Sequence, residues 1–347
     1  MDIERVVHAK LAVREAIAAM LDNIEACDEV WTVSRGAGES LRALGYQGEY
    51  RVMNNGVDFQ RGRAEPSAVQ EATAGYDLPE GVPVFLFVGR MMNYKGLPLL
   101  LDALKRLADG GRDFRMVFVG KGPDQARLQR RAEALGLMKS GTGPDRCIFV
   151  GPVYDRDALR AWNTRADLFL FPSTFDTNGL VVREAAACGL ASVLIRGSCA
   201  AEGVTDGRNG FVIEEDPEAL AALLERLCGD RAHLREVGDR AMEELYLSWK
   251  DCVGQAYQRY QVILENWRRG TMPARKQLPS DYLVRLTARS MEQREQIRII
   301  REGLFPDFRE TAVGMMENIQ ETEETAAQFL EQLTEDLYRG LTHRRKE

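Results

Sequence analysis

The sequence predicts a doubly wound α/β fold built on a parallel sheet. Between Val84 and Cys228, short apolar runs alternate with segments of helical pattern. Most of these runs are apolar along their whole length, which is typical of strands covered by helices on both faces. Ligands of such sheets bind beyond the carboxyl ends of the strands, so the loops that follow the strands are the expected functional positions.

Six strands are expected, at residues 84–89, 115–120, 147–151, 167–172, 192–195 and 210–213. The helices between them are expected to begin near Leu97, Asp124, Asp155, Gly179 and Pro217. Residues 83–228 therefore form one predicted ligand-binding domain of Rossmann-like type.

The residues on either side of this domain have different patterns. Residues 1–60 suggest helix, strand, helix and strand at 5–27, 28–34, 36–46 and 50–58, which predicts the remnant of a second α/β domain and a connecting strand. The charged residues 61–82 are predicted to be a linker. From residue 229 to 347 the pattern is helical, which predicts a helical C-terminal extension.

Composition and charge exclude several classes of protein. The 347 residues are enough for two domains, and the net charge of -7 gives no reason to expect a nucleic-acid partner. Six cysteines occur without a CxxC pair, so we expect reduced thiols of a cytoplasmic protein rather than disulfides or a zinc site. The sequence contains no run of eighteen apolar residues, so no membrane-spanning helix is predicted.

Two acids flank the predicted start of a helix after the fourth strand. Asp176 lies in the loop, and Glu184 follows after seven intervening residues, about one and a half turns into the helix. Between them, Asn178, Gly179 and Leu180 carry amides at the helix N-terminus, where free N–H groups and the helix dipole favour phosphate. This spacing suits a ligand with a diphosphate between two sugars, which is the layout of a nucleotide-sugar.

Two cations follow the first strand of the domain. Arg90 comes directly after Gly89, and Lys95 lies in the next loop. Glycine allows a ligand to approach the backbone, and the two cations can neutralise a diphosphate leaving group. The alternative is a loop with two surface cations, and the acid pair downstream favours the functional interpretation.

The segment from Asp176 to Glu184, followed by the small residues EAAACGLASV, resembles the signature of retaining GT-B glycosyltransferases of the family-four type. That signature has two Glu separated by seven residues, and here Asp176 replaces the first. Asn55-Gly56-Val57-Asp58 resembles the end of the interdomain strand of the same family. The resemblance extends over about residues 28–267 and is densest from 84 to 228.

The resemblance implies transfer of a sugar from a nucleotide diphosphate donor to an acceptor hydroxyl, with retention at the anomeric carbon. It implies no cofactor and no bound metal, a lipid-linked or cell-surface glycan as acceptor, and a cytoplasmic enzyme that contacts the inner face of the membrane. In the family the catalytic positions correspond to Asp176, which orients the sugar, Glu184, which holds the ribose, and Arg90 and Lys95, which stabilise the leaving group. The implied donor-binding set is Gly89, Arg90, Lys95, Val153, Asp176, Asn178, Gly179, Leu180 and Glu184.

Two other classes of function remain open at this point. Family members carry a large acceptor domain upstream of the matching part, so the chain could bind a nucleotide-sugar without transferring it, or could act with a partner chain that supplies the acceptor domain. An epimerase or phosphorylase of the same fold is the other class. An epimerase needs additional acid and base residues at the sugar, and a phosphorylase needs a pyridoxal-phosphate lysine, and neither pattern is evident.

Overall fold

The computed structural model describes residues 3–138, 145–272 and 291–295. The chain divides into two units, Met1–Lys276 and Gln277–Glu347, and residues 291–295 are the described part of the second. The fold below is that of the first unit.

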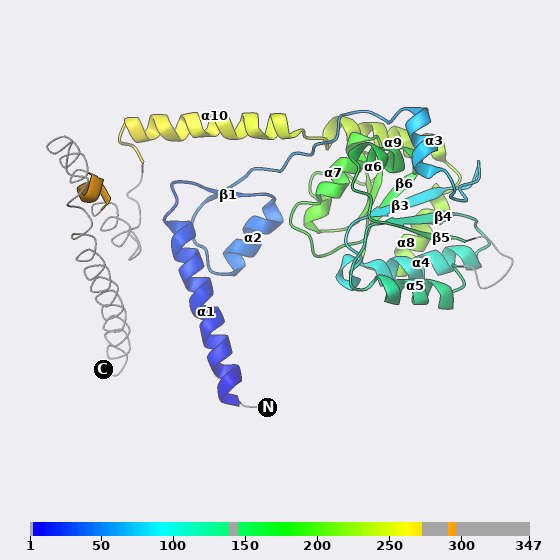
Figure 1. Ribbon diagram of the computed structural model, residues 1–347, viewed down its shortest axis with the longest axis horizontal. Coiled ribbons are helices and arrows are strands. Elements are labelled where there is room, and N and C mark those ends of the chain that lie inside the picture. The colour runs from blue at the N-terminus through cyan, green and yellow to red at the C-terminus, as the bar shows by residue number, and fades with distance from the viewer. Residues whose placement is uncertain (1–2, 139–144, 273–290, 296–347) are drawn as a thin grey trace, which may run out of the picture. The chain divides into compact units, whose positions relative to one another are not determined.

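The central element is a six-stranded parallel sheet, as the sequence predicts (Figure 1). Its strands are β3 (Val84–Val88), β4 (Arg115–Val119), β5 (Cys147–Gly151), β6 (Leu168–Phe171), β7 (Ser192–Ile195) and β8 (Phe211–Ile213). They lie in the order β5-β4-β3-β6-β7-β8. The chain thus winds outward from β3 to β5, returns to place β6 beside β3, and continues to the other edge. Every residue of β3, β4, β6 and β7 is buried, and all are apolar except Arg115 and Ser192, the first residues of β4 and β7.

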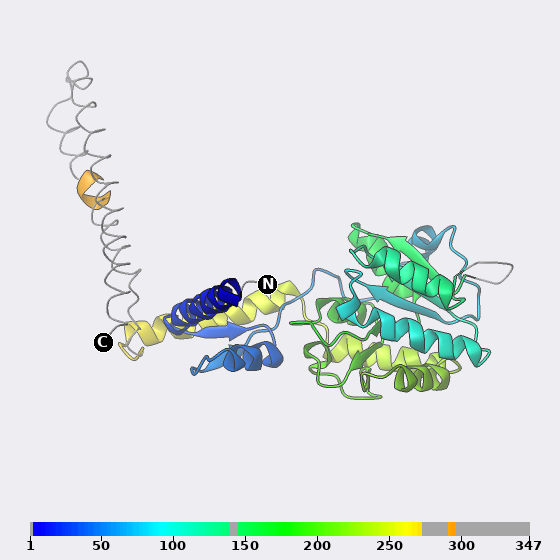
Figure 2. The same cartoon turned by 90° about the horizontal axis from the view of Figure 1, so that it is seen from below.

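Helices cover both faces of this sheet. On one face lie α4 (Leu97–Asp109), α5 (Gln125–Ala134) and α8 (Pro217–Leu227), and on the other α6 (Arg156–Arg165), α7 (Leu180–Ala187) and α9 (Arg231–Glu244) (Figure 1). Helices α4 and α5 lie below the sheet in Figure 1 and face the viewer in Figure 2. Stacked phenylalanines extend through the core, with ring centroids 6.0 Å apart for Phe87 and Phe171 and 4.7 Å for Phe118 and Phe149. The predicted doubly wound sheet is therefore confirmed.

The N-terminal residues form a small α/β piece. It consists of α1 (Ile3–Glu25), β1 (Val30–Thr32), α2 (Arg35–Ala43) and β2 (Tyr50–Val52), with the two strands parallel. The strand expected at 50–58 is shorter, because its last residues pair elsewhere. The Val57 amide donates to the Leu247 carbonyl at 2.9 Å, so this end of the segment is bound to the chain before α10 (Trp249–Arg268).

The predicted linker at 61–82 contains a helix that the sequence analysis did not expect. Helix α3 (Pro66–Thr73) begins with a proline in its first turn, where the missing N–H costs nothing, and packs against α6. Tyr76, just after it, meets the buried Trp162 edge to face at 5.2 Å. This segment therefore packs onto the domain.

The predicted helical extension at 229–347 is described only in part. Helices α9 and α10 and residues 291–295 are helical, and residues 273–290 and 296–347 lie outside the described residues. Within the part of the chain that the structure describes, no helix is long and apolar enough to cross a membrane.

Candidate functional site

The candidate residues lie on loops at the carboxyl ends of strands β3, β5 and β6. Gly89 and Arg90 follow β3, Val153 follows β5, and Asp176 follows β6. Because β3 and β6 are neighbours at the point where the strand order reverses, their loops meet. This is the position at which doubly wound sheets bind ligands.

The structure brings Lys95 and Asp176 together. Lys95 ends the 3-10 helix η1 (Asn93–Lys95), and its ammonium donates to the Asp176 carboxylate at 2.7 Å and to the Phe175 carbonyl at 3.3 Å. Both side chains are largely buried, with exposed fractions of 15% and 18%. The two residues that the sequence assigns to a leaving group and to a sugar are thus one ion pair in this structure.

Asp176 also shapes the turn before α7. Its second carboxylate oxygen accepts from the amides of Asn178 at 3.0 Å and Gly179 at 2.6 Å. Burial alone would raise the pKa of Asp176, but the hydrogen bond from Lys95 and those from the Gly179 and Asn178 amides lower it below its ordinary value. The carboxylate therefore remains charged at neutral pH.

The hydrogen bonds to Asp176 occupy amides that the sequence analysis assigns to phosphate binding. The amides of Asn178 and Gly179, two of the expected phosphate donors, donate instead to the Asp176 carboxylate, which lies three residues before the N-cap Gly179. A carboxylate close to a helix N-terminus is itself a suitable anion there. Gly179 has φ of +62°, and a Cβ there would lie 2.9 Å from the Cα of Ala200, so this close approach requires glycine. The Leu180 amide is bonded to no acceptor among the described residues.

The side chain of Asn178 is directed to the N-terminal piece. Its amide nitrogen donates to the carbonyl of Val33, and its Oδ1 is buried with no partner among the described residues. The resemblance places only its backbone at the donor, and the side-chain contact is a feature that the sequence did not predict.

Glu184 lies on α7 in a partly enclosed position. Its side chain is 17% exposed, and the contact that it makes is an ion pair with Arg156, whose Nη1 lies 3.6 Å from the carboxylate. No hydrogen bond to this carboxylate comes from the described residues. Burial raises the pKa of Glu184, the Arg156 guanidinium lowers it, and the Asp58 carboxylate raises it, with a net shift above the ordinary value. A mostly buried carboxylate without donors has unused capacity to accept hydrogen bonds.

The remaining candidate residues differ in their burial and in the contacts that they make. Arg90 is exposed and forms no hydrogen bond or ion pair with the described residues. Gly89 has φ of +152°. Gly120, directly after the neighbouring strand β4, lies close to it, since a Cβ on Gly120 would lie 2.0 Å from the Gly89 carbonyl oxygen. Val153 is half-buried against the core of the domain.

One acid pair with Asp-x-Asp spacing does occur, at Asp155 and Asp157, although the sequence analysis expects no metal site. Asp155 caps α6 by accepting from the Ala158 amide at 2.7 Å, and Asp157 is exposed and pairs with Arg160 at 3.4 Å. Among residues 3–138, 145–272 and 291–295, no three His, Cys, Asp or Glu side chains gather in a group that could hold a metal ion.

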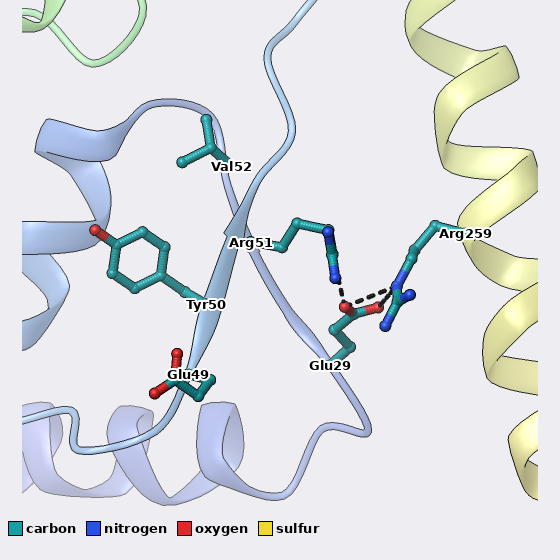
Figure 3. Close-up of a pocket in the computed structure, with 6 residues that line it drawn as sticks. All are labelled: Glu29, Glu49, Tyr50, Arg51, Val52 and Arg259. Atoms are coloured by element: carbon teal, nitrogen blue, oxygen red, sulfur yellow. Dashed lines mark hydrogen bonds and ion pairs between the residues drawn. The ribbon is translucent and has the colours of Figure 1, made fainter.

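A cavity lies away from the candidate site residues. It has a volume of about 620 Å³ and lies beside β2 and α10 (Figure 3). Glu29 is at its centre and accepts from the Nε atoms of Arg51 at 2.9 Å and Arg259 at 2.7 Å. These contacts join the N-terminal piece to α10, and none of the candidate site residues lines the cavity.

The solved structures that resemble this chain are GT-B enzymes. Sucrose-phosphate synthase from Thermosynechococcus elongatus matches with a TM-score of 0.61 and 24% identity, over 72% of this chain and 61% of that chain. Anabaena HepE, solved in complex with UDP and glucose, matches with a TM-score of 0.58 and 22% identity, over 68% and 63%. The parallel six-stranded sheet and its helices therefore match the fold of GT-B structures.

The sequence comparisons match one segment of the chain to a family of glycosyltransferases. Residues 82–230 match the model of glycosyl transferases group 1. D-inositol 3-phosphate glycosyltransferase 2 of Catenulispora acidiphila is 32% identical over 232 residues, which cover 63% of this chain and 52% of the relative. A GDP-mannose-dependent phosphatidylinositol dimannoside mannosyltransferase of Mycobacterium tuberculosis is 35% identical over 133 residues, or 38% and 32%. The chain thus spans about half or less of the length of these relatives.

Two contacts at the site were missed by the sequence analysis. Arg156 bridges the carboxylates of Asp58 and Glu184, at 2.9 Å and 3.6 Å. Asp58 was noted only as the end of a connecting strand, and Arg156 was not singled out. An arginine in the first turn of a helix, where the dipole disfavours cations, was the signal available in the sequence.

Proposed function

We propose that this chain takes part in the transfer of a sugar from a nucleotide diphosphate donor to an acceptor hydroxyl, with retention at the anomeric carbon, and that residues 82–230 bind the donor. The observation that carries the proposal is Glu184, a carboxylate that is mostly buried, receives no hydrogen bond from the described residues and lies on the helix that begins at the β6 loop. A ribose offers two adjacent hydroxyl donors, which match its two free oxygens.

Each further role follows from the geometry of the neighbouring loops. Lys95 and Arg90 carry positive charge at the carboxyl end of β3, where a diphosphate gains charge as it leaves. Asp176, fixed by Lys95 and two amides, is oriented to accept from a hydroxyl of the transferred sugar. The cations supply the charge stabilisation that a divalent ion supplies elsewhere, so we propose metal-independent transfer without a cofactor.

The family and the names of the relatives support this proposal. The group 1 domain is shared with proteins named as glycosyltransferases, and HepE was solved with UDP and with UDP-glucose. For the acceptor we propose a lipid-linked or cell-surface glycan, since the mycobacterial relative is named for a phosphatidylinositol mannoside. This acceptor would bring a cytoplasmic protein to the inner face of the membrane.

Calorimetry on the whole chain with UDP, GDP and ADP tests donor binding. Glu184→Gln should weaken the tightest of these by about 1–3 kcal/mol, the scale for a hydrogen bond to a charged group. Glu133→Gln is the matched control, because Glu133 is exposed on α5 and makes the same change of charge.

If the folded parent chain binds none of the three nucleotides, the proposal is wrong. If Glu184→Gln and Glu133→Gln bind equally well, Glu184 does not hold the ribose. Sugar release from the matching nucleotide-sugar, measured with and without glycan acceptors, then tests transfer, and nuclear magnetic resonance of the product reports the anomeric configuration.

A further inference from the structure

Arg156 stands between two carboxylates that come from distant parts of the chain. Its Nη2 lies 2.9 Å from Asp58, at the end of the connecting segment, and its Nη1 lies 3.6 Å from Glu184 on α7. The contact with Asp58 is within hydrogen-bond distance, whereas the contact with Glu184 is not. One guanidinium thus contacts both carboxylates, and the contact with Asp58 is the closer of the two.

The position of Arg156 is not explained by its own helix. It is the first residue of α6, where the helix dipole is positive and a cation is disfavoured. Asp155 and Asp157 offset this locally, but Asp155 uses its carboxylate to cap the Ala158 amide and Asp157 faces Arg160. The partners that Arg156 does contact are Asp58 and Glu184, so they account for its place.

Asp58 is well placed to be an anchor. Its neighbours Val57 and Phe59 are buried, in a cluster with Ala187 and Cys188 at the end of α7. The Asp58 backbone is therefore fixed against the same helix that carries Glu184, while its carboxylate is exposed and free to hold Arg156.

We propose that Arg156, anchored by Asp58, is a positioning residue for the donor: it holds the Glu184 carboxylate in its charged form and leaves both of its oxygens open to the ribose hydroxyls. This inference rests on the proposed function and adds a residue to it. A carboxylate accepts two hydroxyls best when ionised, and a cation that is near but forms no hydrogen bond supplies charge without occupying an oxygen.

The inference has a consequence for pH dependence. The ionisable groups that face Glu184 are Arg156 from α6, Asp58 from the connecting segment and Cys188 from α7. The thiol of Cys188 is neutral at the relevant pH, because burial raises its pKa to about 12. Removing Arg156 leaves burial and Asp58, which both raise the pKa of Glu184. As pH falls, the nucleotide affinity of the variant should therefore begin to decrease at a higher pH than that of the parent.

The experiment compares nucleotide affinity of the parent, Arg156→Met, Arg156→Lys and Arg131→Met between pH 5.5 and 8.5, as ratios to the parent so that titration of the ligand cancels. The probe is whichever of UDP, GDP or ADP the parent binds most tightly, together with its nucleoside. Arg131→Met is the charge-matched control, since Arg131 pairs with Asp102 between α4 and α5, away from the candidate residues.

We expect Arg156→Met to bind severalfold more weakly than the parent at the acid end of the range and to approach the parent at the alkaline end, because Glu184 without Arg156 becomes protonated at a higher pH than in the parent. Arg156→Lys should regain part of the difference, and it also serves if the Met variant does not fold. The loss should be equal for nucleotide and nucleoside, because Arg156 acts through the group that holds the ribose.

Three outcomes overturn the inference. The first is a profile of Arg156→Met that is parallel to that of the parent at every pH, and the second is an equal change in Arg131→Met. The third is a loss confined to the diphosphate, which would make Arg156 a phosphate ligand. Glu184→Gln separates this inference from the proposed function. If Glu184→Gln binds nucleotide as tightly as the parent, the ribose role of Glu184 is wrong. If Glu184→Gln binds weakly but the affinity ratio of Arg156→Met to the parent does not change with pH, only the role of Arg156 is wrong.

Discussion

The Lys95 ammonium lies 2.7 Å from the Asp176 carboxylate, although the two residues are 81 positions apart in the sequence. The contact depends on the strand order, because β6 lies beside β3 only through the reversal of the sheet. One ion pair thus connects the two loops at the centre of the candidate site. It fixes the position of one loop relative to the other before any ligand is bound.

Replacing Lys95 by Met should affect both folding and binding. It leaves a mostly buried Asp176 without its cation, so the free energy of unfolding should fall by about 1–3 kcal/mol. Urea unfolding at pH 7 measures this. Because the folded pKa of Asp176 is lowered, this stabilisation is present above the unfolded pKa of about 3.9 and is lost as pH falls through the folded pKa. A difference in unfolding free energy between parent and variant that does not narrow as pH falls from 7 toward 2 would contradict the ion pair.

Arg90→Met should separate binding from folding. Arg90 is exposed and has no partner among the described residues, so its removal should change the free energy of unfolding by less than about 0.5 kcal/mol. If Arg90 faces the diphosphate, affinity for a nucleoside diphosphate should fall by about 1–3 kcal/mol while that for the nucleoside stays unchanged. Calorimetry with both ligands decides, and an equal loss for the two would leave Arg90 without a phosphate role.

The two contacts of Asp176 can be separated by two substitutions. Asp176→Asn keeps a side-chain oxygen for the amides of Asn178 and Gly179 but loses the ion pair with Lys95. Asp176→Ala loses both, and it should be less stable than the Asn variant by about 0.5–1.5 kcal/mol, the usual net contribution of a hydrogen bond. Equal stability of the two variants in urea would show that the amide contacts contribute nothing.

The strands of the sheet could be predicted from the sequence almost to the residue. Strands buried on both faces leave continuous apolar runs, and β4, at Arg115–Val119, is one residue shorter than expected. The strand expected at 50–58 was overextended, because residues near Val57 pair with a segment almost two hundred positions later. Helix α3 was missed because its eight residues bury no side chain and carry little periodic signal.

The sequence proposes the residues of the candidate site, but it does not reveal the contacts between them. Lys95, Asp176 and Glu184 were identified from spacing, yet the pairing of Lys95 with Asp176 requires the strand order. The use of the Asn178 and Gly179 amides by Asp176 requires the turn geometry. Arg156 shows the same limit, because its two partners come together only when the connecting segment packs on α7.

Glu184→Gln should make the empty protein more stable while it weakens ligand binding. The folded pKa of Glu184 is raised, chiefly by burial, so its ionised form opposes folding at neutral pH. Below the unfolded pKa of about 4.3, Glu184 is protonated in both states and the substitution should be neutral; the stabilisation should appear as pH rises toward the folded pKa. Thermal unfolding at pH 4 and pH 7.5 tests the sign, and a destabilised variant at pH 7.5 would show that the Arg156 pair outweighs burial.

Glu29 offers a test of how the N-terminal piece is joined to α10. Burial alone would raise the pKa of Glu29, but the hydrogen bonds from Arg259 and Arg51 lower it below its ordinary value. A lowered pKa means stability that is present above the unfolded pKa of about 4.3 and is lost as pH falls through the folded pKa. Glu29→Gln should therefore reduce the free energy of unfolding by about 1–3 kcal/mol at pH 7, and the difference from the parent should close in acid.

Glu49→Gln is the matched control for this prediction. Glu49 lines the same cavity, is exposed, and loses the same charge on substitution (Figure 3). Because it forms no ion pair with the described residues, its removal should change stability by less than about 0.5 kcal/mol. Urea unfolding of both variants at pH 7 and pH 4 makes the comparison. If Glu29→Gln behaves like Glu49→Gln at both pH values, Arg51 and Arg259 do not hold α10 through Glu29, and the contact of Trp31 with Tyr260, at 5.0 Å between ring centroids, would have to do so.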